Sequence, residues 1–146
     1  MHTIVVERTI KAPIEKVFDL LADHANYKQF PGVTGSVLLK EGAPERNGAG
    51  AVRRIETPKG WFEETITAFE RPKRFDYRIT KTSLPLEHQG GSVRCESTAE
   101  GTRVTWTSVV RVKVPVIGGL LTRIVAPTLG KAFGSMLKEV DRRLAA

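Results

Sequence analysis

A glutamate inside an otherwise apolar segment is the residue of this chain best suited to chemistry. The segment alternates as a β-strand, so Glu64 shares one face with Phe62 and Ile66. If that face is the inner one, the carboxylate is costly to bury unless it is paired or keeps its proton. We therefore predict a ligand site in which Glu64 contacts the ligand and Phe62 and Ile66 supply apolar wall.

The preceding strand offers a cation, but its register is open. With Val52 as the inward residue, Arg54 points into the core. With Ile55 inward, Arg54 points to solvent. In the first register Arg54 either pairs with Glu64 across neighbouring strands or helps to anchor a carboxylate or hydroxyl of a ligand. Arg54 is accordingly a candidate ligand-binding residue.

Other polar side chains lie on later predicted strands. The hydroxyl of Tyr77 is placed to donate to a ligand at the end of an apolar slot. Trp106 and Ser108 share one face of the last strand and are expected to form cavity wall. Cys95 would need a partnered base to act as a nucleophile, and His88 lies in a predicted loop. We therefore expect no thiol chemistry.

Catalytic and metal-binding motifs are absent from the sequence. There is no Ser-His-Asp order, no phosphate-binding glycine loop and no paired-carboxylate spacing. One cysteine cannot form an internal disulfide, and no Cys/His cluster has zinc spacing. The first residues alternate and carry charges, so no signal peptide is expected. These features predict a reduced, cytoplasmic protein without metal or cofactor, whose status as an enzyme stays open.

The charge of the chain favours anionic partners without identifying one. Lys and Arg number 23 against 16 Asp and Glu, which gives a net charge of +7. The basic residues are spread along the chain and rarely adjoin aromatic ones, so nucleic-acid binding is not expected. Contact with an acidic membrane surface stays open. The protein is expected to be a monomer or a homodimer.

The order of predicted elements indicates an α+β fold. A strand from Thr3 to Ile10 precedes a short helix after Pro13 and a second helical turn that ends near Phe30. Period-two patterning then continues for roughly eighty residues. The strands expected there are Val37–Glu41, Ala51–Thr57, Trp61–Phe69, Phe75–Thr82, Ser92–Thr98 and Arg103–Val114. A chain of 146 residues has the length of one domain, spanning 1–146.

The C-terminal stretch from Gly119 to Leu144 is predicted to be a long amphipathic helix. Its apolar stripe consists of Leu121, Val125, Leu129, Phe133, Met136, Val140 and Leu144. Pro127 removes an amide hydrogen and crowds the preceding turn. We therefore expect a kink or break near Ala126, with a short lead-in helix before it.

Two glycines inside this helix need an explanation. Gly130 and Gly134 each weaken the helix by about 1 kcal/mol relative to alanine. They indicate either close approach of the helix to the sheet or open volume for a ligand. In the second case, Phe133, Met136 or Leu137 is expected to face Trp106, Tyr77 or Phe62 across an enclosed, largely apolar space.

Two segments carry a resemblance that covers essentially the whole chain. They are TIKAPIEKVFDLLADHANYKQFPGV near the start and GWFEETITAFERPKRFDYRI in the middle, followed by the long helix. The sequence resembles the START and birch-pollen-allergen (SRPBCC) superfamily, in its polyketide cyclase/dehydrase-like branch. The matching positions are Ala12-Pro13, Val17-Phe18, Asp23 and Arg71-Pro72. The resemblance implies a helix-grip fold, with a seven-stranded antiparallel sheet curled around the C-terminal helix.

This superfamily shares no catalytic motif, so the resemblance leaves several functions open. The first is binding of a small hydrophobic molecule, such as a lipid or polyketide, by a carrier or sensor. The second is an enzyme of the cyclase or dehydratase type. A third is a coenzyme-Q-binding lipid chaperone that meets an anionic membrane, because DHANYKQFPGVTGSVLLKEG looks like part of such proteins. The last is an interaction module with a filled core.

Overall fold

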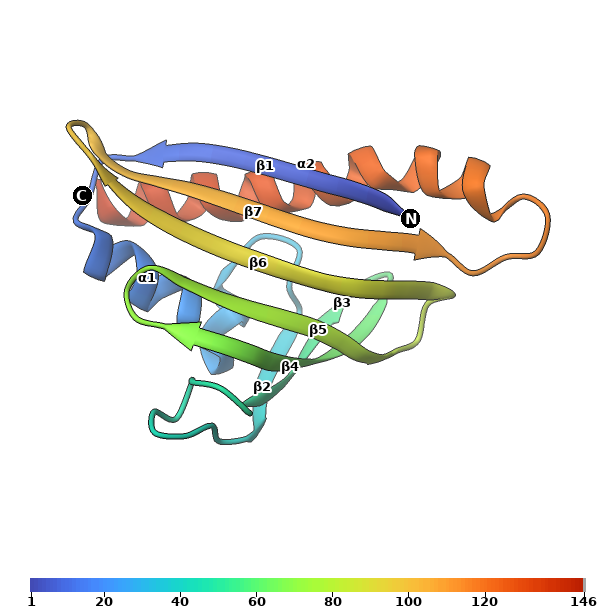
Figure 1. The fold of residues 1–146 in the computed structure, drawn as a ribbon, viewed down its shortest axis with the longest axis horizontal. Coiled ribbons are helices and arrows are strands. Elements are labelled where there is room, and N and C mark those ends of the chain that lie inside the picture. The colour runs from blue at the N-terminus through green and yellow to red at the C-terminus, as the bar shows by residue number, and fades with distance from the viewer. Residues whose placement is uncertain (146) are drawn as a thin grey trace.

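Seven antiparallel strands form one curved sheet in the computed structural model, which describes residues 1–145 (Figure 1). The strands are β1 (His2–Ile10), β2 (Gly35–Lys40), β3 (Val52–Thr57), β4 (Gly60–Glu70), β5 (Arg74–Thr82), β6 (Leu86–Thr98) and β7 (Gly101–Val112). Their order in the sheet is β1-β7-β6-β5-β4-β3-β2. Strands β2 to β7 are thus consecutive neighbours, and β1 joins the free side of β7.

Alternation along the strands sets the concave, buried face of the sheet. In β7, Val104, Trp106 and Ser108 are buried while the residues between them are partly exposed. Strand β6 begins earlier than predicted, at Leu86, because residues 86–91 also pair with β7 through a bulge between His88 and Gly90. His88 therefore lies on a strand rather than in a loop.

Two short helices follow β1, as the sequence predicted. They are α1 (Ile14–Ala22) and the 3₁₀ helix η1 (His24–Gln29). Val17, Phe18 and Leu21 of α1 are fully buried in the main core. Phe18 meets the rings of Phe69 and Phe75 edge to face, at centroid distances of 5.2 and 5.9 Å. Helix α1 therefore closes one end of the concave face.

The long helix α2 (Gly118–Leu144) runs without interruption through Pro127, so the predicted break is wrong. Proline at this position deprives the carbonyl of Arg123 of its helical donor. Both residues are exposed, and water can satisfy that carbonyl. The lead-in and main helices are therefore one element.

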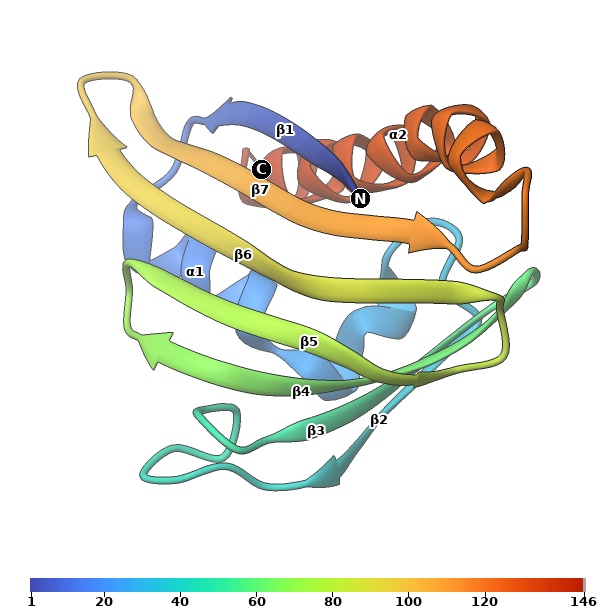
Figure 2. The ribbon, with the colours of Figure 1, turned by 45° about the vertical axis from the view of Figure 1, so that its right-hand side comes forward.

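Helix α2 packs chiefly against β1 and β7 and contacts α1 near its C-terminal end (Figure 2). Met136, Leu137 and Val140 are buried in the main core, and Asp141 accepts hydrogen bonds of 2.9 and 3.0 Å from the Arg8 guanidinium. The arrangement is the α+β helix-grip fold expected from the sequence. No helix within residues 1–145 is both long and apolar enough to cross a membrane.

Candidate functional site

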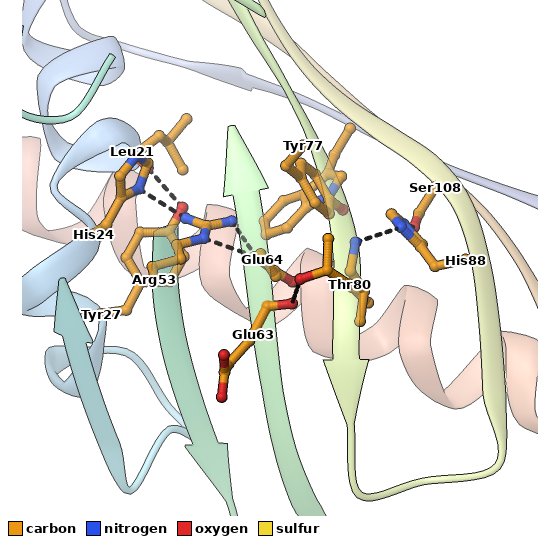
Figure 3. Close-up of polar contacts among 12 residues, drawn as sticks. Leu21, His24, Tyr27, Arg53, Glu63, Glu64, Tyr77, Thr80, His88 and Ser108 are labelled. Atoms are coloured by element: carbon orange, nitrogen blue, oxygen red, sulfur yellow. Dashed lines mark hydrogen bonds and ion pairs between the residues drawn. The ribbon is translucent and has the colours of Figure 1, made fainter. Parts of the chain in front are cut away.

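A buried ion pair lies on the concave face between β3 and β4 (Figure 3). Arg53 and Glu64 stand directly opposite each other in the register of the two strands. The guanidinium Nε and NH2 of Arg53 lie 2.7 and 2.6 Å from the same carboxylate oxygen, Oε1 of Glu64. Their side chains are 1% and 9% exposed, so water barely screens the pair. The inward position predicted for Glu64 is correct.

The predicted partner, Arg54, lies on the opposite face of the sheet. Its guanidinium stacks on Trp61, with Cζ 4.1 Å from the ring centroid, and pairs with Glu56 and Glu63. The inward residue of β3 is therefore Ile55. Apolar side chains on both faces of this short strand left the register open, and a shift of one residue exchanges every side chain between faces.

His24 of η1 extends the pair toward the loop before β3. Its Nδ1 accepts a hydrogen bond of 2.8 Å from NH1 of Arg53, so the ring proton resides on Nε2 and is donated to the carbonyl oxygen of Asn47, 3.1 Å away. Burial and then the charge of Arg53 lower the pKa of His24 to about 2. The imidazole is therefore neutral, and Glu64 alone balances Arg53.

Aromatic rings surround the arginine of this pair. Cζ of Arg53 lies 4.5 Å from the ring centroid of Tyr27, 5.5 Å from that of Tyr77 and 5.9 Å from that of Phe75. Tyr27 donates its own hydroxyl hydrogen to the carbonyl oxygen of Leu21. Burial opposes the charge on Arg53, but Glu64 and Tyr27 outweigh it and raise the arginine pKa. The cation is held in one fixed position.

One oxygen of this network is left over for a ligand. Oε2 of Glu64 makes no hydrogen bond to any of residues 1–145, and it is not sealed from solvent. An ionised carboxylate oxygen is a strong acceptor. Oε2 can therefore accept a hydrogen bond from a hydroxyl group on the concave face.

A second polar group lies next to the ion pair on β5, β6 and β7 (Figure 3). Nε1 of Trp106 donates to the Tyr77 hydroxyl oxygen at 2.7 Å. Burial raises the pKa of Tyr77, and the charge of Glu64 adds to that effect. The phenol therefore keeps its proton at neutral pH.

His88 supports this group from the ring face of Tyr77, with centroids 5.3 Å apart. Its Nδ1 accepts from the backbone amide of Ile79 at 3.0 Å, so Nε2–H donates to Oγ of Ser108 at 2.8 Å. Burial and then the charge of Arg78 lower the pKa of His88 to about 4. Both ring nitrogens are occupied. Burial also raises the pKa of Cys95 to about 12, so this thiol keeps its proton at neutral pH.

The enclosed apolar cavity expected between α2 and the sheet is not formed. Phe133 stacks directly on Trp106, with centroids 4.4 Å apart and planes 8° from parallel. Leu137 and Ile66 are buried, and Phe62 is partly exposed. Two open surface pockets exist elsewhere, one beside Pro13 and Gly101 and one beside Arg8 and Asp141. Neither of these two pockets is lined by the predicted ligand-binding residues.

The two helix glycines face β1 rather than the centre of the concave face. A Cβ at Gly130 would lie 3.6 Å from Ile4, and one at Gly134 would lie 3.9 Å from Val6. Each residue turns an α-helix by 100°, so Val125 and Met136 lie on the opposite flank of α2 from the two glycines. That flank faces away from β1. Both glycines therefore lie at the contact between α2 and β1, where a Cβ would make ordinary van der Waals contact.

Sequence reasoning missed two residues of the site, Arg53 and His24. Arg53 lies two positions before Ile55 and shares its face of the strand. Taking Ile55 as the inward residue would therefore have identified Arg53. Nothing local in the sequence distinguishes His24, whose partners lie 23 and 29 residues away in the chain.

Known proteins match the chain over its full length. Residues 1–146 match the family described as polyketide cyclase / dehydrase and lipid transport. No curated protein sequence matches significantly. A protein from Thermus thermophilus has a TM-score of 0.82 at 22% identity, covering 99% of this chain and 97% of that one. A START superfamily protein from Mycobacterium smegmatis has a TM-score of 0.78 at 16% identity, covering 99% and 98%.

A third similar structure is the di-domain ARO/CYC BexL from the BE-7585A biosynthetic pathway. It has a TM-score of 0.76 at 20% identity, and the match covers 99% of this chain and 50% of that one. At these identities the likeness shows a shared fold.

Proposed function

Because the chain belongs to the polyketide cyclase/dehydrase and lipid transport family, we propose that it binds one small hydrophobic molecule, a lipid or a polyketide. The ligand lies on the concave face, between α2 and strands β4 and β5, and its polar end contacts Glu64 and Tyr77. The protein acts as a carrier or sensor of this molecule in the cytoplasm.

The supporting observation is a partly uncovered apolar surface next to an unpaired carboxylate oxygen. Phe62 and Ile79 flank Glu64 on the concave face, and both are only partly buried because α2 packs chiefly on β1 and β7. Water-exposed apolar surface of this kind gains free energy when a hydrophobic molecule covers it. The surface and Oε2 of Glu64 together fit an apolar molecule with one polar end.

The polar end is a hydroxyl or a carbonyl group. Oε2 of Glu64 has only acceptor capacity, so it favours a hydroxyl donor. The Tyr77 hydroxyl keeps its proton, and a ligand carbonyl oxygen would replace Ser108 as the acceptor of that proton. A ligand carboxylate is disfavoured, because it would lie next to the charge of Glu64.

Entry of the ligand requires the N-terminal half of α2 to move. The C-terminal half is fixed by Met136, Leu137 and Val140 in the core and by the Arg8–Asp141 ion pair. The N-terminal half makes fewer buried contacts. The Thr122 hydroxyl accepts a hydrogen bond from the amide of Val112, and Ala126 packs in a small apolar cluster. Movement of α2 that extends as far as Phe133, just before the fixed segment, separates its ring from Trp106 and opens the space that the ligand fills.

An enzyme of the cyclase or dehydratase type is the second candidate. A protonated phenol and an ionised carboxylate on one face, at Tyr77 and Glu64, are an acid and a base. Turnover of a polyketide-like substrate that falls with Tyr77→Phe, while the variant keeps its fold, would favour the enzyme over the carrier.

Native mass spectrometry of gently purified protein tests the binding proposal. We expect a bound hydrophobic molecule, released on denaturation. Ile79→Asp places a charge on the concave surface and should abolish the adduct. Val5→Asp is the matched control, because Val5 is 60% exposed on the outer face. Absence of an adduct, or its retention in Ile79→Asp, would contradict the site.

A further inference from the structure

Four large apolar side chains are exposed together where β7 leads into α2. Val116 is fully exposed, Ile117 is 49% exposed, and Leu120 and Ile124 are each 61% exposed. Leu120 and Ile124 are one turn apart on the solvent side of the helix, so their side chains adjoin. We call these four residues the apolar tip. An apolar cluster of this kind is typical of a surface that meets a partner.

The stretch of chain that carries the apolar tip has basic residues and no acidic one. Residues 101–138 contain no Asp or Glu. Lys113, Arg123 and Lys131 are exposed, and none of them forms an ion pair with any of residues 1–145. Arg111, which lies further along β7, is paired with Glu87. The exposed apolar side chains thus lie in a stretch of chain that carries unpaired positive charge and no acidic residue.

The tip projects from one end of the molecule (Figures 1 and 2). The amide of Lys113 donates to the carbonyl of Pro85 at 2.7 Å, which joins the β7–α2 connection to the β5–β6 turn. Val116 has φ of 71°, a conformation that a β-branched residue rarely adopts. Such strain is typically retained where the exposed conformation has a function.

From this surface we propose that the protein docks on anionic lipid bilayers through the apolar tip. Val116, Ile117, Leu120 and Ile124 enter the interface between headgroups and acyl chains. Lys113, Arg123 and Lys131 meet the negatively charged headgroups.

Charge favours this partner over a second copy of the chain. Two tips packed together would bring the same unpaired cations next to each other in proteins that each carry a net charge of +7. A bilayer with anionic headgroups offers both the apolar layer and the opposite charge. The docking stands on this surface alone and does not depend on the ligand proposed for the concave face.

Co-sedimentation with lipid vesicles tests the docking. The probes are vesicles of phosphatidylcholine alone and of phosphatidylcholine mixed with phosphatidylglycerol. We expect binding to the mixed vesicles that weakens with added salt, and little binding to phosphatidylcholine alone. The double variant Leu120→Ser/Ile124→Ser should lower the partition coefficient by about tenfold or more. Lys113→Gln/Arg123→Gln should lower it by at least about fivefold.

The matched control is Val5→Ser/Val37→Ser, which removes exposed apolar side chains from the outer face of the sheet. It should bind vesicles like the parent. Thermal unfolding of each variant checks that the fold is kept. Docking through the tip is overturned if the parent does not bind vesicles or if its binding does not depend on headgroup charge. It is also overturned if the control variant loses as much vesicle binding as the tip variant. A dimer that dissociates in Leu120→Ser/Ile124→Ser, without vesicle binding, would assign the tip to self-association instead.

Discussion

Arg53 contacts one oxygen of Glu64 with two of its nitrogens, and the other oxygen, Oε2, has no hydrogen-bond partner among residues 1–145. The two residues face each other across neighbouring strands, and both are buried. Because His24 is neutral, the charges of Arg53 and Glu64 cancel each other. A ligand hydroxyl can therefore bind Oε2 without breaking the ion pair.

Replacing Glu64 by Gln should destabilise the fold strongly. The substitution leaves the buried guanidinium of Arg53 without a counter-charge, which costs about 3 to 5 kcal/mol. Urea unfolding of Glu64→Gln and of the parent measures the difference in the free energy of unfolding.

Two further variants separate loss of the charge pair from loss of the side chain. Glu63→Gln removes a partly exposed partner of Arg54 on the outer face and should cost no more than about 1 kcal/mol. The double variant Arg53→Met/Glu64→Leu should be more stable than Glu64→Gln, because it removes both charges. Equal losses in Glu64→Gln and Glu63→Gln would show that the inner pair is not effectively buried.

Each of the helix glycines should be replaceable by alanine with a gain in stability. A Cβ at Gly130 or Gly134 meets Ile4 or Val6 at ordinary contact distance, and alanine favours the helix by about 1 kcal/mol. The melting temperature should rise by about 2 to 4 °C for each substitution. Ligand binding should not change, since both positions face β1.

Gly91→Ala is the contrasting variant. A Cβ at Gly91 would overlap the ring of Tyr77, so this substitution should destabilise the protein by about 1 to 3 kcal/mol. A fall in melting temperature for Gly130→Ala or Gly134→Ala would mean that β1 and α2 are packed too tightly there for a methyl group.

Stability should decline with acid below the ordinary histidine pKa of 6.5. His24 and His88 have folded-state pKa values of about 2 and about 4, so the unfolded chain binds protons first as the pH falls. Their stabilising contribution is complete above about pH 6.5 and is lost below it, by up to about 1.4 kcal/mol per pH unit for each imidazole.

Urea unfolding between about pH 6.5 and about pH 4 tests this dependence. His24→Gln should lower the slope to about half, because glutamine does not titrate and His88 still does. His2→Gln, at an exposed histidine, is the control and should leave the slope unchanged. A slope that His24→Gln does not alter would place the proton uptake elsewhere.

The order of the elements could be read from the sequence because each has a strong period. The switch from period two to period 3.6 after Pro115 marks β7 and α2, and Pro13 marks the start of α1. The inward position of Glu64 followed from Ile66 on the same strand. Alternation within a long strand therefore sufficed for half of the ion pair.

The other half of the ion pair, Arg53, could not be predicted from local sequence. Strand β3 has apolar residues on both faces, and only its pairing with β4 decides that Arg53 is inward. A bulge in β4 likewise places Phe69, and not Ala68, opposite Phe75. The contact of Phe133 with Trp106 depends on where α2 lies over the sheet. Tertiary packing, which no single segment encodes, decides these points.

The two tryptophans provide the most direct test that a hydrophobic ligand binds on the concave face. Trp106 lies on that face and Trp61 on the outer one. In Trp61→Phe, we predict that a nitroxide-labelled long-chain alcohol quenches Trp106 fluorescence saturably, and that the unlabelled alcohol reverses the quenching. In Trp106→Phe, Trp61 should show only weak, unsaturable quenching. Absence of saturable quenching of Trp106, or equal quenching of both tryptophans, would contradict binding on the concave face.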